Sequence, residues 1–278
     1  MPAESFVITV LAGVNGAGKS SVGGAQLMAC GGEFYNPDLA ARAARAAVPT
    51  LTSEAANAFA WRHGKERLEA AIANRTDFNF ETTLGGETIT KLLIEAATKG
   101  ATLNIWYAGL ANVELHLKRV AARVKKGGHH IAESDIRKRW IGSHLNLIKL
   151  LPHVTNLRVY DNSAEKDPAQ GEVPEPKLVL AITDHAIQFP GPDDVEHTPE
   201  WAKPIVVAAF QLMPQGEVLQ DEVTTDEKAR DQTPQDRKTE GNHGNPACAD
   251  SGNHQRLPVR MEFLSPTAIH PIGSVREL

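Results

Sequence analysis

A glycine-rich segment near the amino terminus has the spacing of a phosphate-binding loop. Residues 13–20 read Gly-Val-Asn-Gly-Ala-Gly-Lys-Ser, which matches the pattern G-x-x-x-x-G-K-[ST]. Glycines let the main chain turn sharply and bring its N–H groups against phosphate oxygens. We expect Lys19 to reach the β- and γ-phosphates of a nucleotide and the Ser20 hydroxyl to ligate Mg²⁺. The segment follows an apolar run, Phe6 to Leu11, and opens a helical run, Lys19 to Ala29, as phosphate binding requires. The residues expected to contact the nucleotide are Gly13, Asn15, Gly16, Ala17, Gly18, Lys19, Ser20 and Ser21.

Two carboxylates follow short predicted strands, where phosphoryl transfer needs acids near the acceptor and the metal. Asp38 comes after the strand predicted at Glu33–Tyr35, and it would accept or orient the proton of an attacking hydroxyl. Glu81 ends the strand predicted at Asp77–Glu81, and it would hold a metal-bound water or a substrate hydroxyl. Structural alternatives stay open for both. Asn36–Asp38 also fits a turn that caps the next helix, and Glu81 fits a solvated strand end or helix cap.

A basic segment supplies cations that a closing lid would need. Arg119 and Arg123 are four residues apart on one predicted helix, so they share a face. The Gly127-Gly128 pair is a natural hinge, and closure would bring positive charge onto the transferring phosphoryl group and exclude water. The alternative is a solvated basic face, which we favour for Lys125, Lys126 and Lys138. The neighbouring histidines His129 and His130 lack cysteine or carboxylate partners at ligand spacing, which argues against zinc.

Strands alternate with helices along the chain, which predicts an α/β fold: a three-layer P-loop kinase fold with a mostly parallel five-stranded sheet and a C-terminal hairpin. The predicted strands are Phe6–Leu11, Glu33–Tyr35, Asp77–Glu81, Thr102–Ala108 and Leu157–Tyr160, and the hairpin is Leu178–Ile182 with Ala186–Phe189. The predicted helices are Lys19–Ala29, Glu54–Ala73 capped by Ser53, Glu87–Thr98, Val113–Lys126 capped by Asn112, Asp135–Leu150 and Pro199–Phe210. Residues 1–213 form the predicted kinase domain. Residues 214–278 are too polar to bury a core and predict a disordered tail.

Composition narrows the function classes. The net charge of −5 and the aromatic content of 5% argue against nucleic-acid binding and against a polynucleotide kinase. The N-K-x-D motif of GTPases is missing from the sequence. The two cysteines, Cys30 and Cys248, predict no disulfide framework and suit a reducing compartment. No apolar run approaches the roughly 20 residues that span a bilayer, so we expect a cytoplasmic protein without a membrane partner.

The motifs together resemble those of the zeta toxin family. The resemblance rests on GVNGAGKSS, the Asn-Pro-Asp at Asn36–Asp38, FETTLGG at Phe80–Gly86, the basic segment Arg119–Trp140 and YDNS at Tyr160–Ser163, in this order, over about residues 5 to 210. Zeta toxins are P-loop kinases that use ATP and Mg²⁺ to phosphorylate UDP-N-acetylglucosamine, and a small antitoxin protein neutralises many of them. The resemblance therefore implies a nucleotide-sugar substrate and a separate antitoxin partner.

The resemblance also assigns roles to individual residues. It implies that Lys19 and Ser20 bind the nucleotide phosphates and the metal and that Asp38 is the base that activates the sugar hydroxyl. It makes Glu81 the acid after the third strand, and Thr82 and Thr83 the lining of the sugar site. It makes Arg119 the arginine near the phosphates, with Arg123 as a second candidate. In place of the family's second lid arginine it offers His130 or Arg137. The segment Gly127–Asp135 lacks the proline-containing turn of the family.

Three functions remain open at this point. The leading one is an ATP-dependent phosphotransferase that moves the γ-phosphoryl group to a sugar hydroxyl of UDP-N-acetylglucosamine. A second is a P-loop kinase of another small metabolite or an antibiotic. A third is a nucleotide-binding regulatory protein without transferase activity, in which the polar tail binds a partner.

Overall fold

A single mixed sheet forms the centre of the structure, a computed structural model that describes residues 5–20, 22, 34–164 and 175–213. The chain divides into two units, residues 1–226 and 227–278, and all described residues belong to the first. The predicted tail, most of the helix predicted at Lys19–Ala29, and Ser21 lie outside the described residues. The strands of the described part are β1 (Phe6–Ala12), β2 (Phe34–Tyr35), β3 (Phe78–Thr82), β4 (Ala101–Gly109), β5 (Asn156–Asp161), β6 (Lys177–Thr183) and β7 (Ala186–Phe189).

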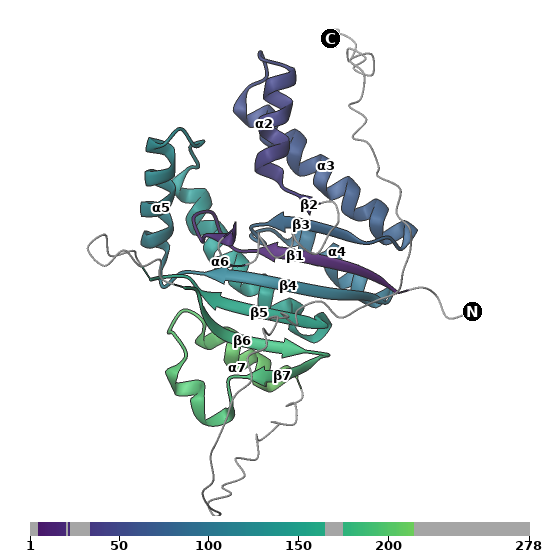
Figure 1. Cartoon of the computed structure of the whole chain (residues 1–278), viewed down its shortest axis with the longest axis vertical. Coiled ribbons are helices and arrows are strands. Elements are labelled where there is room, and N and C mark those ends of the chain that lie inside the picture. Colours follow the sequence, from purple (N-terminus) through teal and green to yellow (C-terminus); the bar gives the residue numbers. More distant parts are fainter. Residues whose placement is uncertain (1–4, 21, 23–33, 165–174, 214–278) are drawn as a thin grey trace, which may run out of the picture. The chain divides into compact units, whose positions relative to one another are not determined.

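The strand order of the sheet is β2-β3-β1-β4-β5-β6-β7 (Figure 1). Strands β1 to β5 are parallel, with β1 paired to β3 on one side and to β4 on the other. The apolar β1 is buried along nearly its whole length, as expected of a central parallel strand. Because parallel strands end at one edge of a sheet, the ends of β1, β3 and β4 meet there.

The predicted hairpin extends this sheet, so the sheet has seven strands rather than five. Strand β6 pairs antiparallel with β5, and β7 pairs antiparallel with β6. Pairing with β6 covers the edge of β5, which would otherwise present unpaired N–H and C=O groups. The hairpin turn confirms the predicted one, because Asp184 and His185 have φ angles of 49° and 63°. Positive φ at both central residues is what a tight type I′ turn requires.

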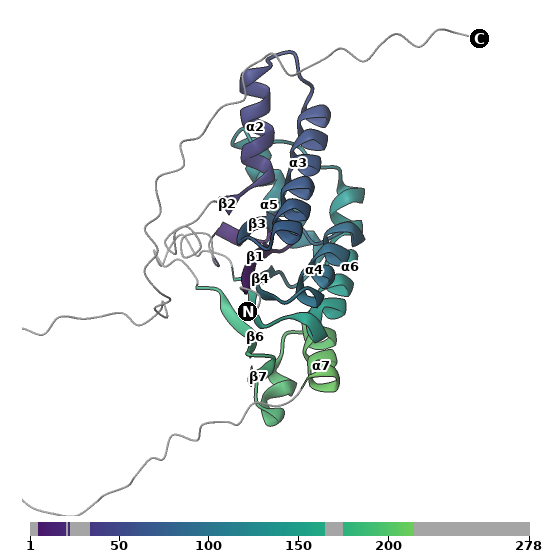
Figure 2. The ribbon, with the colours of Figure 1, turned by 90° about the vertical axis from the view of Figure 1, so that its right-hand side faces the viewer.

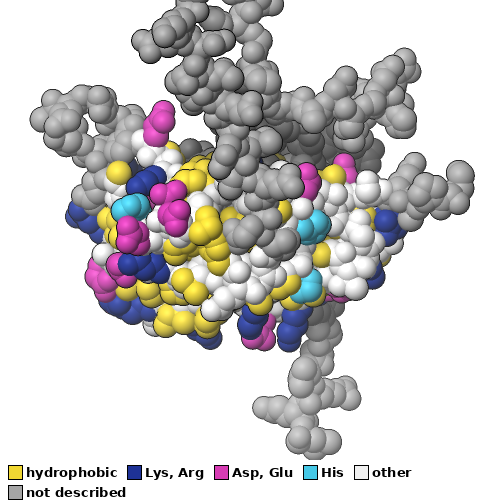
Figure 3. All heavy atoms as spheres, turned by 90° about the horizontal axis from the view of Figure 1, so that it is seen from below, with side chains coloured by type: hydrophobic (Ala, Val, Ile, Leu, Met, Phe, Trp, Pro, Cys, Tyr) yellow, Lys and Arg dark blue, Asp and Glu magenta, His cyan; other side chains and the backbone are white. Residues whose placement is uncertain are grey.

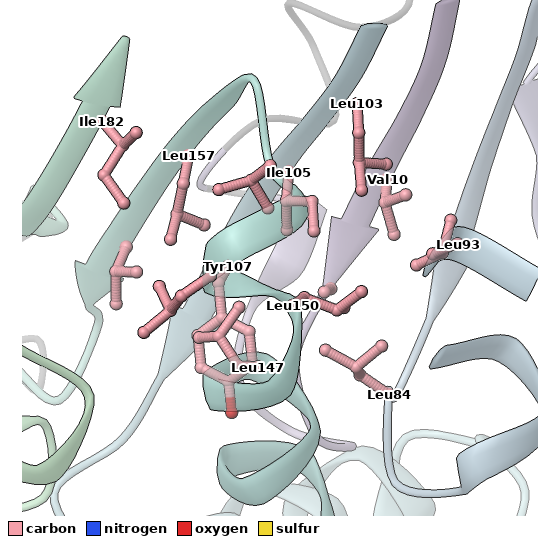
Figure 4. Close-up of a cluster of buried hydrophobic side chains, with 14 of the residues drawn as sticks. Val10, Leu84, Leu93, Leu103, Ile105, Tyr107, Leu147, Leu150, Leu157 and Ile182 are labelled. Atoms are coloured by element: carbon pink, nitrogen blue, oxygen red, sulfur yellow. The ribbon is translucent and has the colours of Figure 1, made fainter. Parts of the chain in front are cut away.

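In the described part of the chain, α3, α4, α6 and α7 lie on one face of the sheet, as Figure 2 shows. Figure 4 shows the core beneath them, where Leu103 and Ile105 of β4 point toward Leu147 and Leu150 of α6. Each such fully buried side chain stabilises the fold by roughly 1.5–3 kcal/mol, so the helices hold the sheet edge in place. The helices of the described part are α2 (Pro37–Ala47), α3 (Ser53–Asn74), α4 (Glu87–Thr98), α5 (Val113–Lys125), α6 (Glu133–Leu150) and α7 (Lys203–Leu212).

The bounds of α3, α4, α5 and α6 match the predicted helices to within two residues at each end, and three other differences stand out. Helix α2 has no counterpart among the predicted elements. The N-cap of α3 is Thr52 rather than Ser53, because the Thr52 hydroxyl accepts the N–H of Ala55 at 3.1 Å. Helix α7 begins at Lys203 rather than Pro199. Pro204 lacks an N–H group, so it suits the first turn of a helix and not its interior.

The surface at the β7 edge of the sheet mixes side chains of different kinds. Figure 3 shows acidic and basic groups interspersed there, with apolar side chains between them. The exposed apolar residues of this end of the fold include Phe189, Val207 and Leu212. A stripe of basic residues, the footprint of nucleic-acid binding, is not seen on this view. None of the helices in the described part is long and apolar enough to cross a membrane.

Candidate active site

The phosphate loop leaves the carboxyl end of β1 with a backbone that only glycine tolerates well. Gly13, Gly16 and Gly18 have φ angles of 140°, 84° and 77°. A Cβ atom on Gly13 would lie 2.4 Å from the carbonyl oxygen of Ala108 on β4. This close approach of two backbones explains why the first glycine of the pattern stands where it does. Lys19, Ser20 and Val22 are helical.

Contacts from four distant elements hold the loop. The Gly13 N–H donates to the Thr82 carbonyl of β3 at 3.2 Å, and Asn162, just after β5, donates from Nδ2 to the Ala17 carbonyl at 2.8 Å. The Asn15 side chain accepts a hydrogen bond from Nη1 of Arg139 on α6 at 2.8 Å. The loop is therefore fixed in shape by groups that lie far apart in the sequence.

A buried histidine makes the fourth contact. Nδ1 of His116 on α5 lies 2.9 Å from the Asn15 carbonyl oxygen. That oxygen can only accept, so Nδ1 carries the proton of the neutral ring. Burial lowers the pKa of His116 to about 4 despite this hydrogen bond. Burial also lowers the pKa of His144 on α6 to about 4. Both imidazoles are neutral near pH 7.

Lys19 faces a carboxylate next to the loop. Its Nζ donates to the Gly13 carbonyl at 2.8 Å and lies 3.3 Å from Oε1 of Glu81 at the end of β3. The Lys19 and Glu81 side chains are 9% and 16% exposed, so water screens this ion pair weakly. The other Glu81 oxygen accepts a hydrogen bond from Nδ2 of Asn36 at 2.9 Å. A lysine, a carboxylate and an amide therefore form one network at the sheet edge.

Asp38 lies in the first turn of α2. Asn36 caps this helix, since its Oδ1 accepts the N–H groups of Asp38 at 2.9 Å and Leu39 at 3.2 Å. The Asn-Pro-Asp segment is thus a helix-capping turn, and Asn36 is its capping residue. The Asp38 carboxylate takes no part in the cap; Oδ2 lies 3.7 Å from Nη1 of Arg123 at the end of α5.

A cavity of about 690 Å³ adjoins this network. Its walls come from α2 and α3, from the β3–α4 loop, and from the segment between α5 and α6 with the first turns of α6. This volume is within the range of small-molecule sites. The predicted site residues that line the cavity are Asn15, Lys19, Asp38, Glu81, Thr82, Thr83 and His130.

The predicted arginines of α5 are not part of the cavity lining. Among the described residues, neither Arg119 nor Arg123 lines the cavity. Arg119 donates from Nη2 to the carbonyls of Ser163 at 3.4 Å and Ala164 at 3.2 Å, beyond β5. The two arginines therefore point to different partners, although they share one helix. Their roles stay predictions, as does the metal role of Ser20.

Arg139 is a further candidate for the second lid cation, beside the predicted His130, which also lines the cavity. Arg137 is held outside the cavity by Glu114 and Glu133, whose carboxylates raise its pKa. Arg139, two residues later, lines the cavity and also contacts Asn15 of the loop. The sequence of the basic segment did not single out Arg139, because two adjacent turns of one helix carry several cations. Only the tertiary packing determines which of these side chains lines the cavity.

Helix α3 contributes cavity residues that the motifs did not indicate. Asn57, Trp61 and Lys65 are spaced four residues apart, so they form one stripe along α3. Lys65 also forms an ion pair with Glu69 at 2.6 Å. A helical stripe of this kind is visible in the sequence, but the cavity that it faces is not.

The oxygen donors near the loop fit Mg²⁺ better than a metal held by protein alone. The described residues contain no group of three or more His, Cys, Asp or Glu that could hold a metal. Mg²⁺ usually keeps several waters and is bound through one or two carboxylates and substrate phosphates. The Ser20 hydroxyl and the Glu81 carboxylate have the chemistry that such an ion needs.

Similarity to known proteins is limited to fold and to one short stretch. No protein-family model matches the chain. An uncharacterized protein of Haemophilus influenzae (strain ATCC 51907 / DSM 11121 / KW20 / Rd) is 39% identical over 70 residues, which cover 25% of this chain and 50% of that protein. The chain therefore matches about half the length of this curated relative.

Solved structures share the fold at low sequence identity. The AvrRxo1-ORF1:ORF2 complex, solved with ATP, has a TM-score of 0.53 and 12% identity over 70% of this chain and 64% of that chain. A second structure of the complex gives a TM-score of 0.53 and 11% identity over 77% and 72% of the two chains. The PezAT toxin–antitoxin system of Streptococcus pneumoniae has a TM-score of 0.44 and 14% identity, over 63% of this chain and 76% of that chain, too low to assign the chain to that group. The predicted α/β fold class, with its mostly parallel sheet, is confirmed by the strand order and by the likeness to AvrRxo1.

Proposed function

We propose that the chain is an ATP-dependent kinase that transfers a γ-phosphoryl group to a hydroxyl of a small acceptor, most specifically a sugar hydroxyl of UDP-N-acetylglucosamine. The observation that carries the proposal is the position of Asp38. Its carboxylate lines the same cavity as Lys19 of the phosphate loop and Glu81 of β3. A base, a phosphate-binding cation and a second carboxylate around one cavity are the parts that phosphoryl transfer needs.

Each residue has a role that follows from its place. Lys19 leaves the Gly13 carbonyl and bonds the β- and γ-phosphates. Asp38 accepts the proton of the acceptor hydroxyl as its oxygen attacks the γ-phosphorus atom, and ADP leaves on the opposite side. Arg139 brings positive charge to the phosphates from α6. Mg²⁺, held by Ser20 and Glu81 together with the nucleotide, would neutralise charge on the phosphates.

Arg123 is suited to a ligand that the described residues do not supply. Its Nε and Nη2 are buried without a hydrogen-bond partner in the described part of the chain. Buried donors normally find acceptors. Movement at the adjacent Gly127-Gly128 hinge would let phosphate oxygens or the Asp38 carboxylate satisfy them.

The choice of acceptor draws on the resemblance to zeta toxins and on the cavity. A cavity of about 690 Å³ has room for more than one ring. Trp61 lines it with a side chain that is 51% exposed, which offers an aromatic face to a sugar or base. The AvrRxo1 complex solved with ATP supports ATP as the donor by likeness of fold. That complex contains a second protein, ORF2, which supports the idea of a separate protein partner for this chain, the antitoxin that the resemblance to zeta toxins implies. A cytoplasmic location belongs to the same proposal.

The test is direct. Purified protein is incubated with ATP, Mg²⁺ and UDP-N-acetylglucosamine, and the products are examined by mass spectrometry for one added phosphate. Asp38→Asn is expected to lose the product, and Asp193→Asn, on the 3₁₀ helix Pro192–His197 outside the cavity, is expected to retain it. If the protein instead phosphorylates another metabolite or an antibiotic in a wider panel, the proposed acceptor would be wrong and the proposed kinase activity would stand. ATP binding without transfer to any acceptor would favour a regulatory protein and overturn the proposal.

A further inference from the structure

We propose that Asn36 is a positioning residue that couples the nucleotide side of the site to the acceptor side. The inference rests on the proposed kinase function and deepens it. Asn36 lies at the junction between β2, a strand of two residues, and α2, the helix that carries Asp38. Its side chain contacts both sides of the site at once.

The two ends of the Asn36 amide have different partners. Oδ1 accepts two main-chain N–H groups of α2, and Nδ2 donates to Oε2 of Glu81 at 2.9 Å. The reverse orientation would place Oδ1 against a carboxylate and the NH₂ group against N–H donors, so the neighbours fix the amide in this orientation. A cap residue needs only the first set of contacts. Capping therefore does not explain the hydrogen bond from Nδ2 to Glu81.

The contacts form a continuous path across the site. Lys19 pairs with Oε1 of Glu81, Glu81 accepts from Asn36, and Asn36 holds the N–H of Asp38. Nucleotide binding draws Lys19 toward the phosphates, which weakens its hold on Glu81. The Asn36 amide then remains as a tether between the Glu81 carboxylate and the helix of the base. The position of Asp38 relative to the phosphates therefore depends on this amide.

Few other contacts tie α2 to the sheet edge. Helix α2 packs chiefly against α3, through a small cluster of Ala41, Ala56 and Ala60. The strand before it is anchored by the Tyr35 hydroxyl, which donates to the Ala60 carbonyl at 2.5 Å. These contacts keep the helical hairpin of α2 and α3 folded when Asn36 is changed. They also leave the angle of α2 toward Glu81 to the Asn36 side chain.

Substitutions at Asn36 separate coupling from capping. Asn36→Ser keeps a good N-cap acceptor but is too short to reach Glu81. Asn36→Asp keeps the cap and places a second carboxylate against Glu81. Thr52→Ala removes the matching cap of α3, which makes no contact of this kind, and serves as the control. A role in capping alone predicts near-normal turnover for both Asn36 variants.

Coupling predicts a different pattern. We expect kcat for phosphorylation of UDP-N-acetylglucosamine to fall about tenfold in Asn36→Ser and further in Asn36→Asp, in line with other groups that orient catalytic carboxylates. The KM for ATP should stay within about twofold in Asn36→Ser, and Thr52→Ala should keep the wild-type kcat. In a Glu81→Gln background, Asn36→Ser should lower kcat by a smaller factor than it does in the wild type, because the two side chains act together.

The outcomes distinguish this inference from the proposed function. A wild-type kcat in Asn36→Ser, measured on a wild-type enzyme that does transfer phosphate, overturns the coupling and leaves the kinase assignment intact. Full additivity with Glu81→Gln overturns it as well. A wild-type protein that transfers phosphate neither to UDP-N-acetylglucosamine nor to any acceptor of the panel overturns the proposed function, and the inference with it.

Discussion

The phosphate loop and the α2–α3 hairpin both line one cavity, and they are held in different ways. The loop is held by hydrogen bonds from four elements, including the buried His116 of α5 and the half-buried Arg139 of α6. In the hairpin, α3 packs into the main core through Leu68, Ala71 and Ile72, whereas α2 is held mainly by α3, through small alanine contacts. The loop is therefore tied to several elements, and α2 is tied chiefly to one. Such an arrangement suits a fixed donor site beside an adjustable acceptor site.

Removal of the loop cation should have the largest effect on turnover. Lys19→Ala is expected to lower phosphoryl transfer about a hundredfold or more, because no other described side chain occupies the position between Gly13 and Glu81. Initial rates of product formation at saturating substrate give the measurement. Lys99→Ala, a cation outside the cavity lining that pairs with Glu95 at 2.7 Å, is the matched control and should change the rate far less. ATP bound as tightly by Lys19→Ala as by the wild type would contradict the loop assignment.

A glycine substitution should break the loop through its backbone. Gly13→Ala places a Cβ 2.4 Å from the Ala108 carbonyl oxygen at a φ of 140°, and we expect it to lower the free energy of unfolding by at least about 2 kcal/mol. Gly86→Ala is the control, since nothing lies within 4 Å of its added Cβ. Denaturant unfolding with and without ATP measures both effects. Equal stability of the two variants would show that the loop is less rigid than its contacts indicate.

The same contrast explains what the sequence allowed us to predict. The loop follows from a motif whose chemistry fixes residue types and spacing, so Lys19 and the glycines were identified without a structure. The parallel strands and most helices followed from apolar runs and end signals such as Asn112, which does cap α5. Local signals of this kind involve only a few neighbouring residues, so they can be recognised in a single sequence.

The residues that α3 contributes to the cavity depend on tertiary packing and were not predicted. Helix α2 was not predicted, although its alanines and arginines recur with a helical period and Asn36 caps its start. Trp61 and Arg139 belong to the cavity because α3 and α6 happen to present them there, and many other residues of these helices point elsewhere. The sheet was underestimated for a similar reason, since a hairpin in sequence does not say whether β6 pairs with β5.

An aromatic substitution on α3 tests the hairpin side by itself. Trp61→Ala should weaken acceptor use about tenfold in kcat/KM, equivalent to about 1.4 kcal/mol, with little change in the KM for ATP. Phe59→Ala is the matched control: it is similarly exposed, at 46% against 51%, but it stacks on His63 rather than lining the cavity. Kinetics with varied acceptor and fixed ATP give the measurement. A shared loss in both variants would indicate damage to α3 instead of a lost contact with the acceptor.

At neutral pH the smallest effect is expected from His116, which destabilises the loop side only in acid. Burial lowers the pKa of His116 to about 4 in the folded protein, against about 6.5 in the unfolded chain. Between these values the unfolded state binds more protons, so this histidine contributes stability above about pH 6.5 that is lost as the pH falls toward 4.

His116→Gln keeps a donor for the Asn15 carbonyl and cannot titrate. The slope of unfolding free energy against pH should therefore be shallower in this variant between pH 6.5 and 4, by at most about 1.4 kcal/mol per pH unit. His197→Gln, at a histidine that is 72% exposed, controls for the loss of an ordinary imidazole. Parallel slopes in the wild type and His116→Gln would mean that acid acts on the protein elsewhere. A shallower slope accompanied by retained ATP binding at pH 5 would place the acid sensitivity in the support of the phosphate loop, because α5 delivers that ring to Asn15 of the loop.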